Sequence, residues 1–272
     1  ACFSVGQGGD DTREIKDQWF LEKIAKANLK YGFINIYCGE SSTLSSCCRL
    51  RSSVSDLGYA NSFGAGSTKI GSLGVVTLNL PKLAGASRDL EEFLCFIAPV
   101  VREAAAINAA KRGFIKDRIA RGSLPLYTMG FMDLSRQYST CGFTGLYEAL
   151  AMLGHDMRTD EGLEAAERVL AAINAENAKM SKKYGAPHNM EQVPGESSAV
   201  KLARKDALLG YELHEGEAPA LYSNQFLPLW AEGADVLDRI RVQGALDSLC
   251  TGGAVCHLNI GSEITDAEVM KA

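Results

Sequence analysis

The sequence has few residues of the kinds that build metal centres or nucleic-acid surfaces. It has only 4 histidines, and His155, His188, His214 and His257 are isolated from one another, which indicates surface or satisfied core positions rather than metal ligands. Its 8 cysteines are scattered without zinc-site spacing, which is typical of reduced, mostly buried thiols in a cytosolic protein. With 28 Lys and Arg against 33 Asp and Glu, the net charge of −5 excludes a strong electrostatic attraction to nucleic acid.

Signals for membranes and secretion are also missing. No apolar run looks long enough to span a bilayer, and no cleavable signal pattern begins at Ala1, so we expect a cytoplasmic protein without a membrane partner. What is present is a globular composition, with 46% hydrophobic and 22% charged residues over 272 positions. A chain of this size can bury a sizeable core.

Strand-like and helix-like segments alternate along the chain, which predicts an α/β fold with parallel strand pairing. Strands are expected at 33–37, 71–81, 138–144, 189–193, 222–229 and 249–260. Helices are expected at 10–31, 88–112, 146–154, 160–184, 198–206 and 234–248. Pro99 should kink the second helix, and Gly113 should end it.

Two adjacent thiols, Cys47 and Cys48, stand beside the fixed positive charge of Arg49. A nearby cation favours thiolate over thiol, so this is a candidate site of cysteine chemistry. The Gly- and Ser-rich stretch 61–72 follows, and then an apolar strand, so a long hairpin with the thiols on its first arm or at its tip is expected. Buried structural cysteine is the plainer interpretation, and from chemistry alone the two are evenly balanced.

The segment Pro194-Gly195-Glu196-Ser197-Ser198 connects a predicted strand to a predicted helix. Free backbone N–H groups at a helix N-terminus, with hydroxyls beside them, suit a phosphate or carboxylate. An ordinary cap, with one of the two serines as the N-cap residue, is the simpler interpretation and is favoured by the residues alone.

Other polar residues give weaker signals. Cys141 precedes Gly142 before a predicted helix, and a small residue at a tight strand-to-helix turn explains it better than a reactive thiol. Glu40, Glu148 and Glu191 could serve as acid or base, but the sequence does not separate those roles from cap or surface positions.

Six short motifs nevertheless occur together in one order, and the stretch that contains them resembles the anaerobic (class III) ribonucleoside-triphosphate reductases from about residue 20 to the C-terminus. They are SCCRLR at 46–51, FGAG at 63–66, GSLGVVTLNLP at 71–81, TCGFTGLYEAL at 140–150, PGESS at 194–198 and TGGAVCHL at 251–258. Each is weak alone, but six in the family's order are specific.

The resemblance implies a ten-stranded α/β barrel with a finger loop through its middle. The finger would be the hairpin around Cys47 and Cys48. By resemblance Cys48, directly before Arg49, carries a thiyl radical that abstracts the 3′-hydrogen of a ribonucleotide, and Cys47 is the reserve candidate. Residues 194–198 resemble the loop that binds the substrate phosphates, and Cys141 receives no catalytic role.

The resemblance also implies parts that are not found in this sequence. A glycyl-radical motif, a Cys-rich metal-binding segment, an ATP-binding regulatory module and the first part of the barrel are all missing. We therefore expect 1–272 to be a single segment of the catalytic barrel, inactive alone, that works with its missing parts in a homodimeric enzyme. The implied enzyme has a glycyl radical made by an S-adenosylmethionine and iron–sulfur activase, and ATP or deoxynucleotide effectors, with no cofactor held in this segment.

Two alternatives remain at this point. The chain could be a non-catalytic remnant or split-subunit interaction protein that keeps the half-barrel, although the intact Cys48, Arg49 and 194–198 weigh against decay. It could also be a glycyl-radical enzyme acting on carbon–carbon bonds, but the phosphate-type turn speaks against that class.

Overall fold

The computed structural model describes residues 2–4, 17–31, 35–37, 43–45, 51–53, 69, 71–210, 221–257 and 266. The chain divides into two compact units, one made of 1–68 with 258–272 and the other of 69–257. Each unit is described by itself.

The first unit contains short elements. Strand β1 (Cys2–Ser4) pairs in parallel with β2 (Asn35–Tyr37), and helix α1 (Gln18–Tyr31) separates them in the chain. Strands β3 (Thr43–Ser45) and β4 (Arg51–Ser53) form an antiparallel pair. The predicted helix 10–31 is confirmed over 18–31 and the predicted strand 33–37 over 35–37, whereas residues 10–16 lie outside the described residues.

The second unit is built on a three-stranded parallel sheet in the order β5-β6-β7. Its strands are β5 (Gly71–Asn79), β6 (Gln137–Thr144) and β7 (His188–Gln192). The central strand β6 is buried along nearly its whole length, whereas β5 is only partly buried, because β5 pairs with β6 alone within the described residues. The predicted parallel α/β organisation is confirmed, but the ten-stranded barrel is not seen within the described part of the chain.

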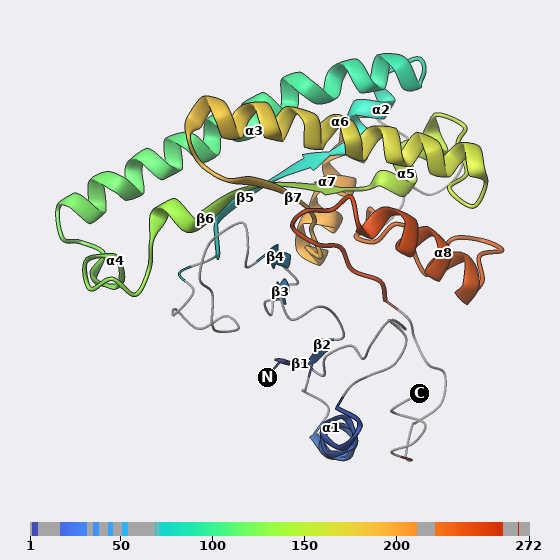
Figure 1. The fold of residues 1–272 in the computed structure, drawn as a ribbon. Helices are drawn as coiled ribbons and strands as arrows, with labels where there is room; N and C mark the ends of the chain where they lie inside the picture. The colour runs from blue at the N-terminus through green and yellow to red at the C-terminus, as the bar shows by residue number, and fades with distance from the viewer. Residues whose placement is uncertain are drawn as a thin grey trace. The chain divides into compact units, whose positions relative to one another are not determined.

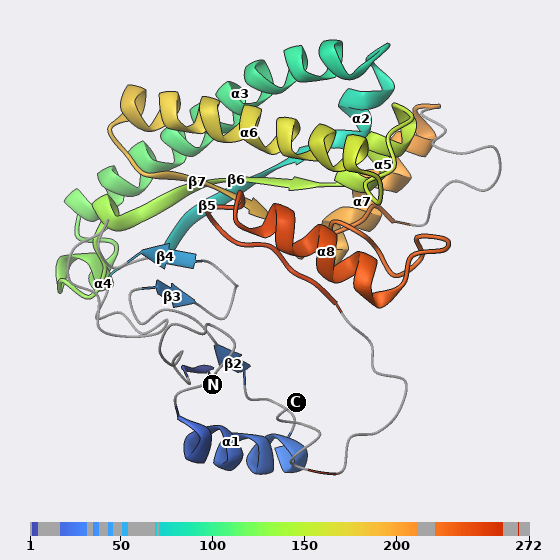
Figure 2. The same cartoon turned by 45° about the vertical axis from the view of Figure 1, so that its right-hand side comes forward.

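Two long helices cover one face of this sheet. Helix α3 (Leu90–Ala120) connects β5 to β6, and α6 (Asp160–Tyr184) connects β6 to β7, and the two lie side by side over the strands (Figures 1 and 2). Their apolar faces form the core with the strands; the largest buried side chains include Phe93, Ile97, Phe143, Leu170 and Ile173. An ion pair of 3.2 Å between Arg102 and Glu176 also joins the two helices.

Local signals explain where the helices begin and end. The Thr159 side chain accepts a hydrogen bond from the Gly162 amide and begins α6, and Gly185, with φ of 58°, ends it, so the prediction of 160–184 is confirmed. The expected end of α3 at Gly113 is wrong, because the helix continues to Ala120. A glycine inside a helix costs only ~1 kcal/mol relative to alanine, which is too little to end a helix by itself.

The shorter helices lie at the ends of the strands. They are α2 (Leu80–Gly85), α4 (Pro125–Thr128), the 3₁₀ turn η1 (Leu134–Arg136), α5 (Leu146–Met152), α7 (Glu196–Leu208) and α8 (Val236–Asp247). The strand predicted at 222–229 is wrong, since this segment is irregular. Of the strand predicted at 249–260, the described residues 249–257 contribute only an isolated parallel bridge between Gly253 and Glu191 of β7, and 258–260 lie outside the described residues.

One expectation about membranes also changes. Within the described residues, α3 is long and apolar enough to cross a bilayer by length and composition alone, contrary to the sequence analysis. Its side chains Phe93, Ile97 and Val101 are fully buried against the sheet and α6, as in the core helix of a globular unit.

Candidate functional site

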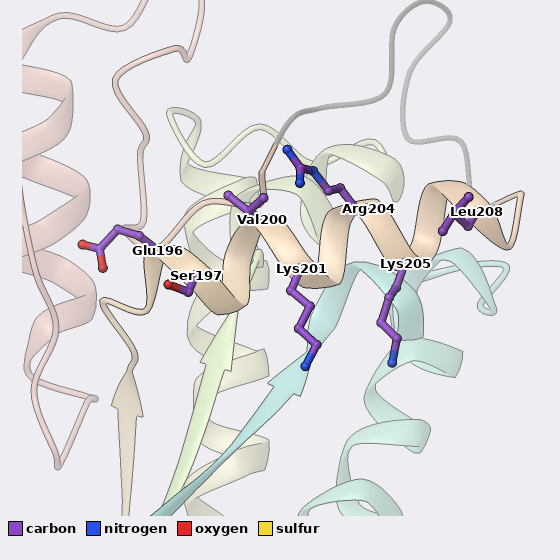
Figure 3. A pocket seen from close by; sticks show the side chains of 7 residues that line it. All are labelled: Glu196, Ser197, Val200, Lys201, Arg204, Lys205 and Leu208. Carbon is purple, nitrogen blue, oxygen red and sulfur yellow. The ribbon is translucent and has the colours of Figure 1, made fainter.

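Ligands of parallel α/β sheets bind outside the carboxyl ends of the strands. Here β6 and β7 each end in a short turn that leads into a helix, α5 and α7 respectively. Helix α7 crosses over the tips of the strands, from β7 toward β5 (Figure 3). The turn 194–198 therefore lies at the carboxyl edge of the sheet.

The N-cap residue of α7 is Gly195, and neither serine occupies that position, so the cap interpretation is wrong. Ser197 and Ser198 lie in the first helical turn, where the Ser198 hydroxyl donates to the Gly195 carbonyl oxygen at 2.7 Å and Ser197 is exposed. Among the described residues, no side chain accepts a hydrogen bond from the first amide groups of α7. A Cβ atom on Gly195 would stand 2.5 Å from the Ser198 hydroxyl oxygen, so a larger residue here would displace that side chain. The first amide groups of α7 are thus left to an external acceptor.

The solvent-facing side of α7 lines an open groove of about 580 Å³. Ser197, Lys201 and Lys205 are spaced four residues apart, so they share one side of the helix, and the two lysines extend together while Arg204 points away from them (Figure 3). Neither lysine pairs with a carboxylate among the described residues. The groove is lined by three cations, Lys201, Arg204 and Lys205, and by one exposed carboxylate, Glu196, in the first turn of α7.

Helix α7 is held over the strands by a buried carboxylate. Asp206 accepts hydrogen bonds on Oδ2 from Asn79 Nδ2 at 2.6 Å and from the Tyr222 hydroxyl at 2.8 Å. Asp206 and Tyr222 are buried, and burial together with the bond to Asp206 raises the pKa of the Tyr222 phenol. Asp206 therefore connects α7 by hydrogen bonds to the end of β5 and to the segment that contains Tyr222.

A second buried carboxylate fixes the irregular segment that follows. Glu148, in the first turn of α5, accepts hydrogen bonds from the Ser223 amide at 2.9 Å and the Ser223 hydroxyl at 2.7 Å. The Ser223 carbonyl oxygen accepts from Thr144 Oγ1 and from the Gly145 amide, each at 2.9 Å. Burial raises the pKa of Glu148. Its contacts assign Glu148 a positioning role at the strand ends.

Two cysteines of the second unit, Cys141 and Cys250, are buried. Cys141 lies inside β6 and not at the strand-to-helix turn, which Gly145 makes with φ of 74°. Burial raises the pKa of both Cys141 and Cys250 to about 12, so neither forms a thiolate near neutral pH.

The predicted radical cysteines, Cys47 and Cys48, lie outside the described residues, as does Glu40. The residues on either side of them, Ser45 of β3 and Arg51 of β4, are paired in an antiparallel register. Among the described residues, β5 pairs with β6 and β3 pairs with β4. The segment 54–68 that would connect the thiols to the expected second arm at 71–81 lies outside the described residues, so the long hairpin stays a prediction.

The three described histidines have different surroundings. His155 lies 3.7 Å from a Glu161 carboxylate oxygen, His188 begins β7, and His214 lies outside the described residues. The His257 amide donates to Gln225 Oε1 at 3.0 Å. Among the side chains that the structure describes, no group of three His, Cys, Asp or Glu could hold a metal ion.

Sequence reasoning missed the residues that hold the turn in place. Asp206 resembles an ordinary helix residue, and Tyr222 and Ser223 lie in a segment predicted to be a strand. Their partners are distant in the chain: Asp206 and Asn79 are separated by 127 positions and Ser223 and Glu148 by 75. The one available signal was a polar residue in each of two sequence motifs: Asn79 in the motif at 71–81 and Glu148 in the motif at 140–150.

Comparison with known proteins decides the family. The model of the anaerobic ribonucleoside-triphosphate reductase family matches residues 7–272. The chain belongs to this family. No curated protein sequence matches the chain significantly.

Solved structures of anaerobic ribonucleotide reductases resemble this chain in fold. One covers 98% of this chain with a TM-score of 0.80 and 34% identity. The Thermotoga maritima enzyme with MES in its active site covers 98% of this chain with a TM-score of 0.79 and 34% identity. The same enzyme in complex with dATP and CTP covers 98% of this chain with a TM-score of 0.77 and 32% identity. The chain spans 42% of the first structure and 44% of each of the other two, less than half of their length.

Proposed function

We propose that this chain forms part of the catalytic core of an anaerobic ribonucleotide reductase that reduces ribonucleoside triphosphates to deoxyribonucleotides. The observation that supports this most directly is the uncapped first turn of α7 at the carboxyl edge of the sheet, in a family that acts on nucleotides. A relative in this family was crystallised with dATP and CTP. Within the described residues β5 pairs with β6 alone, which is consistent with further barrel strands contributed by the rest of the enzyme.

In this proposal the substrate phosphates bind at residues 194–198. The free amides of α7 and the Ser197 hydroxyl donate to one phosphate, as helix N-termini do in other phosphate sites. Lys201 lies one helical turn further on the same side, within reach of the next phosphate, and Lys205 lies a turn beyond. Such a row of donors suits a chain of phosphates better than a single carboxylate.

The family resemblance assigns the radical chemistry to Cys48, and Cys47 is the second candidate. The thiyl radical takes the 3′-hydrogen of the bound ribonucleotide, and the 2′-hydroxyl leaves as water. Formate or a small thiol protein would supply the two electrons of the reduction, and the 3′-hydrogen then returns from the thiol. This sequence of steps needs a cysteine beside the ribose and a fixed phosphate group, and the chain has candidates for both.

The proposed enzyme needs parts beyond this chain. The glycyl radical would come from a separate domain, charged by an S-adenosylmethionine and iron–sulfur activase, and ATP and deoxynucleotides would act as effectors. The active form would be a cytoplasmic homodimer, and this segment alone would be inactive. The ten-stranded barrel and the finger loop around Cys48 belong to the same proposal.

The test uses the full-length protein and follows deoxyribonucleotide formation under anaerobic conditions. Cys48→Ala should abolish turnover while nucleotide affinity stays within about twofold, because the thiol acts on the ribose and not on the phosphates. Cys47→Ala is the matched control and should retain activity. Full turnover in Cys48→Ala would remove the radical assignment, and loss only in Cys47→Ala would move it to Cys47. A wild-type protein that binds nucleotide but never turns over with its activase would favour the non-catalytic remnant.

A further inference from the structure

The segment 222–225 lies between the end of β6 and the start of α7, and backbone hydrogen bonds hold it there. The Tyr222 amide donates to the Ala199 carbonyl oxygen of α7 at 3.4 Å, and the Ser223 carbonyl oxygen accepts from the Gly145 amide at 2.9 Å. Gly145 is the residue that connects β6 to α5. The segment is therefore fixed at the carboxyl edge of the sheet, beside the first turn of α7.

Asn224, in the middle of this segment, is buried, with 9% of its surface exposed. The residues on either side have side-chain partners: the Ser223 hydroxyl donates to the Glu148 carboxylate, and Gln225 Oε1 accepts from the His257 amide. Within the described ranges, the Asn224 carboxamide forms no hydrogen bond, and neither Nδ2 nor Oδ1 is enclosed by protein. A largely buried side chain therefore presents a donor and an acceptor at the carboxyl edge, both without a partner.

This accessibility distinguishes Asn224 from Asn189 of β7. The polar atoms of the Asn189 carboxamide also have no partner in the part of the chain that the structure describes, but both are enclosed, so no ligand reaches them. A buried polar group without a hydrogen bond destabilises a fold. The Asn224 carboxamide therefore gives the folded chain no hydrogen bond, and it suits a ligand that both donates and accepts.

We infer that the Asn224 carboxamide binds the 2′- and 3′-hydroxyl groups of the substrate ribose, an inference that rests on the nucleotide site proposed at α7. Nδ2 donates to one hydroxyl oxygen, and Oδ1 accepts a hydrogen bond from the other hydroxyl. Phosphate oxygens accept hydrogen bonds, so a phosphate would pair with Nδ2 and leave Oδ1 without a donor. The bases differ in their donors and acceptors, whereas ribose is common to all ribonucleoside triphosphates, the substrates in the family's name.

The position of Asn224 agrees with this role. Asn224 is two residues from Tyr222, whose amide contacts Ala199, and two residues of chain span at most ~7 Å. Ala199 in turn lies two residues after Ser197, which is ~3 Å along the helix axis. The ribose and the first phosphate of a nucleotide are joined by a single methylene group, so one nucleotide can reach both Asn224 and the first turn of α7.

The test measures how strongly unlabelled CTP and inorganic tripolyphosphate displace radiolabelled CTP from the full-length protein. Asn224→Ala should weaken CTP binding by about tenfold, because two hydrogen bonds are lost, and should leave tripolyphosphate binding within about twofold. Its melting temperature should not fall, since no hydrogen bond of the described fold is removed. Asn174→Ala is the matched control: it removes an α6 carboxamide that donates to the Leu249 carbonyl oxygen, and both ligands should bind as in wild type.

A second comparison uses 2′-deoxy-CTP, which lacks one of the two hydroxyl groups. Wild type should bind CTP about fivefold more tightly than 2′-deoxy-CTP, and Asn224→Ala should bind the two within about twofold. Unchanged CTP affinity in Asn224→Ala, an equal loss for tripolyphosphate, or a retained preference for CTP over 2′-deoxy-CTP would each overturn the assignment. Full binding of both CTP and tripolyphosphate in Ser197→Ala with Ser198→Ala would instead refute the phosphate site at α7, whatever the result at Asn224.

Discussion

The Nδ2 group of Asn79, the last residue of β5, donates a hydrogen bond of 2.6 Å to Oδ2 of Asp206 in the last turn of α7. The Tyr222 hydroxyl donates to the same oxygen at 2.8 Å. This arrangement fixes the helix whose first turn is the proposed phosphate site. A change at Asp206 should therefore alter both stability and nucleotide binding, although Asp206 lies at the far end of α7.

Asp206→Ala should lower the free energy of unfolding by about 3 kcal/mol, because it removes two hydrogen bonds and leaves the buried Tyr222 hydroxyl without a partner. Asp206→Asn is the matched control: both bonds end on one oxygen, which the amide can supply, so its cost should stay below about 1 kcal/mol. Urea titration of the full-length variants measures both values. Equal losses in the two variants would show that the shared oxygen does not hold α7.

Glu148 should make stability depend on pH. Burial raises its pKa in the folded protein, so its contribution is fully present below about pH 4.5, its value in the unfolded chain, and is lost as the pH rises through the folded pKa. In Glu148→Gln the amide can still accept from the Ser223 amide and donate to the Ser223 hydroxyl, but it cannot ionise. The stability of Glu148→Gln relative to wild type should therefore increase between pH 5 and pH 8. Melting temperatures at the two pH values test this, and a constant difference would contradict the role of ionisation.

Gly145 and Gly154 separate the effect of backbone conformation from that of crowding. Both have positive φ, of 74° and 81°, but a Cβ on Gly145 would lie 2.4 Å from Pro81, whereas one on Gly154 meets nothing within 4 Å. Gly154→Ala should cost ~1 kcal/mol from the left-handed conformation alone. Gly145→Ala should cost at least ~2 kcal/mol more, since overpacking adds to that strain. Similar unfolding free energies for the two would mean that the end of β6 relaxes freely.

The thiols of the second unit should differ sharply in reactivity. Burial raises the pKa of Cys141 and of Cys250 to about 12, and both are buried, whereas Cys95 on α3 is exposed. Iodoacetamide should modify Cys95 in the native protein and reach Cys141 and Cys250 only after unfolding. Peptide mass mapping with and without denaturant gives the answer. Rapid native modification of Cys141 would show that β6 opens, and would restore it as a candidate reactive thiol.

Elements with strong local signals were predictable from sequence, and α6 shows why. Its start depends on the Thr159 cap and its end on Gly185, both of which are properties of neighbouring residues. The failures come from distant contacts. Residues 222–229 have strand-like composition, but the amide and hydroxyl of Ser223 bond to the Glu148 carboxylate and not to a neighbouring strand.

The candidate site could be predicted only in part for the same reason. The turn 194–198 is a local motif, and its place after β7 follows from the alternation of strands and helices. The residues that fix it, Asn79, Asp206 and Tyr222, come together only in the folded chain. The cap interpretation failed because α7 begins at Glu196, so Gly195 takes the N-cap position and both serines lie inside the first turn.

The central claim, that the first turn of α7 holds the phosphates of a ribonucleotide, is tested most directly by the dissociation constant of CTP for full-length variants. Ser197→Ala combined with Ser198→Ala should weaken binding by about tenfold, and Lys201→Ala should do the same, because each removes donors along one side of α7. Arg204→Ala, which removes a charge that points away from Lys201 and Lys205, should leave affinity within about twofold. Unchanged CTP affinity in the double serine variant, or an equal loss in Arg204→Ala, would contradict the account.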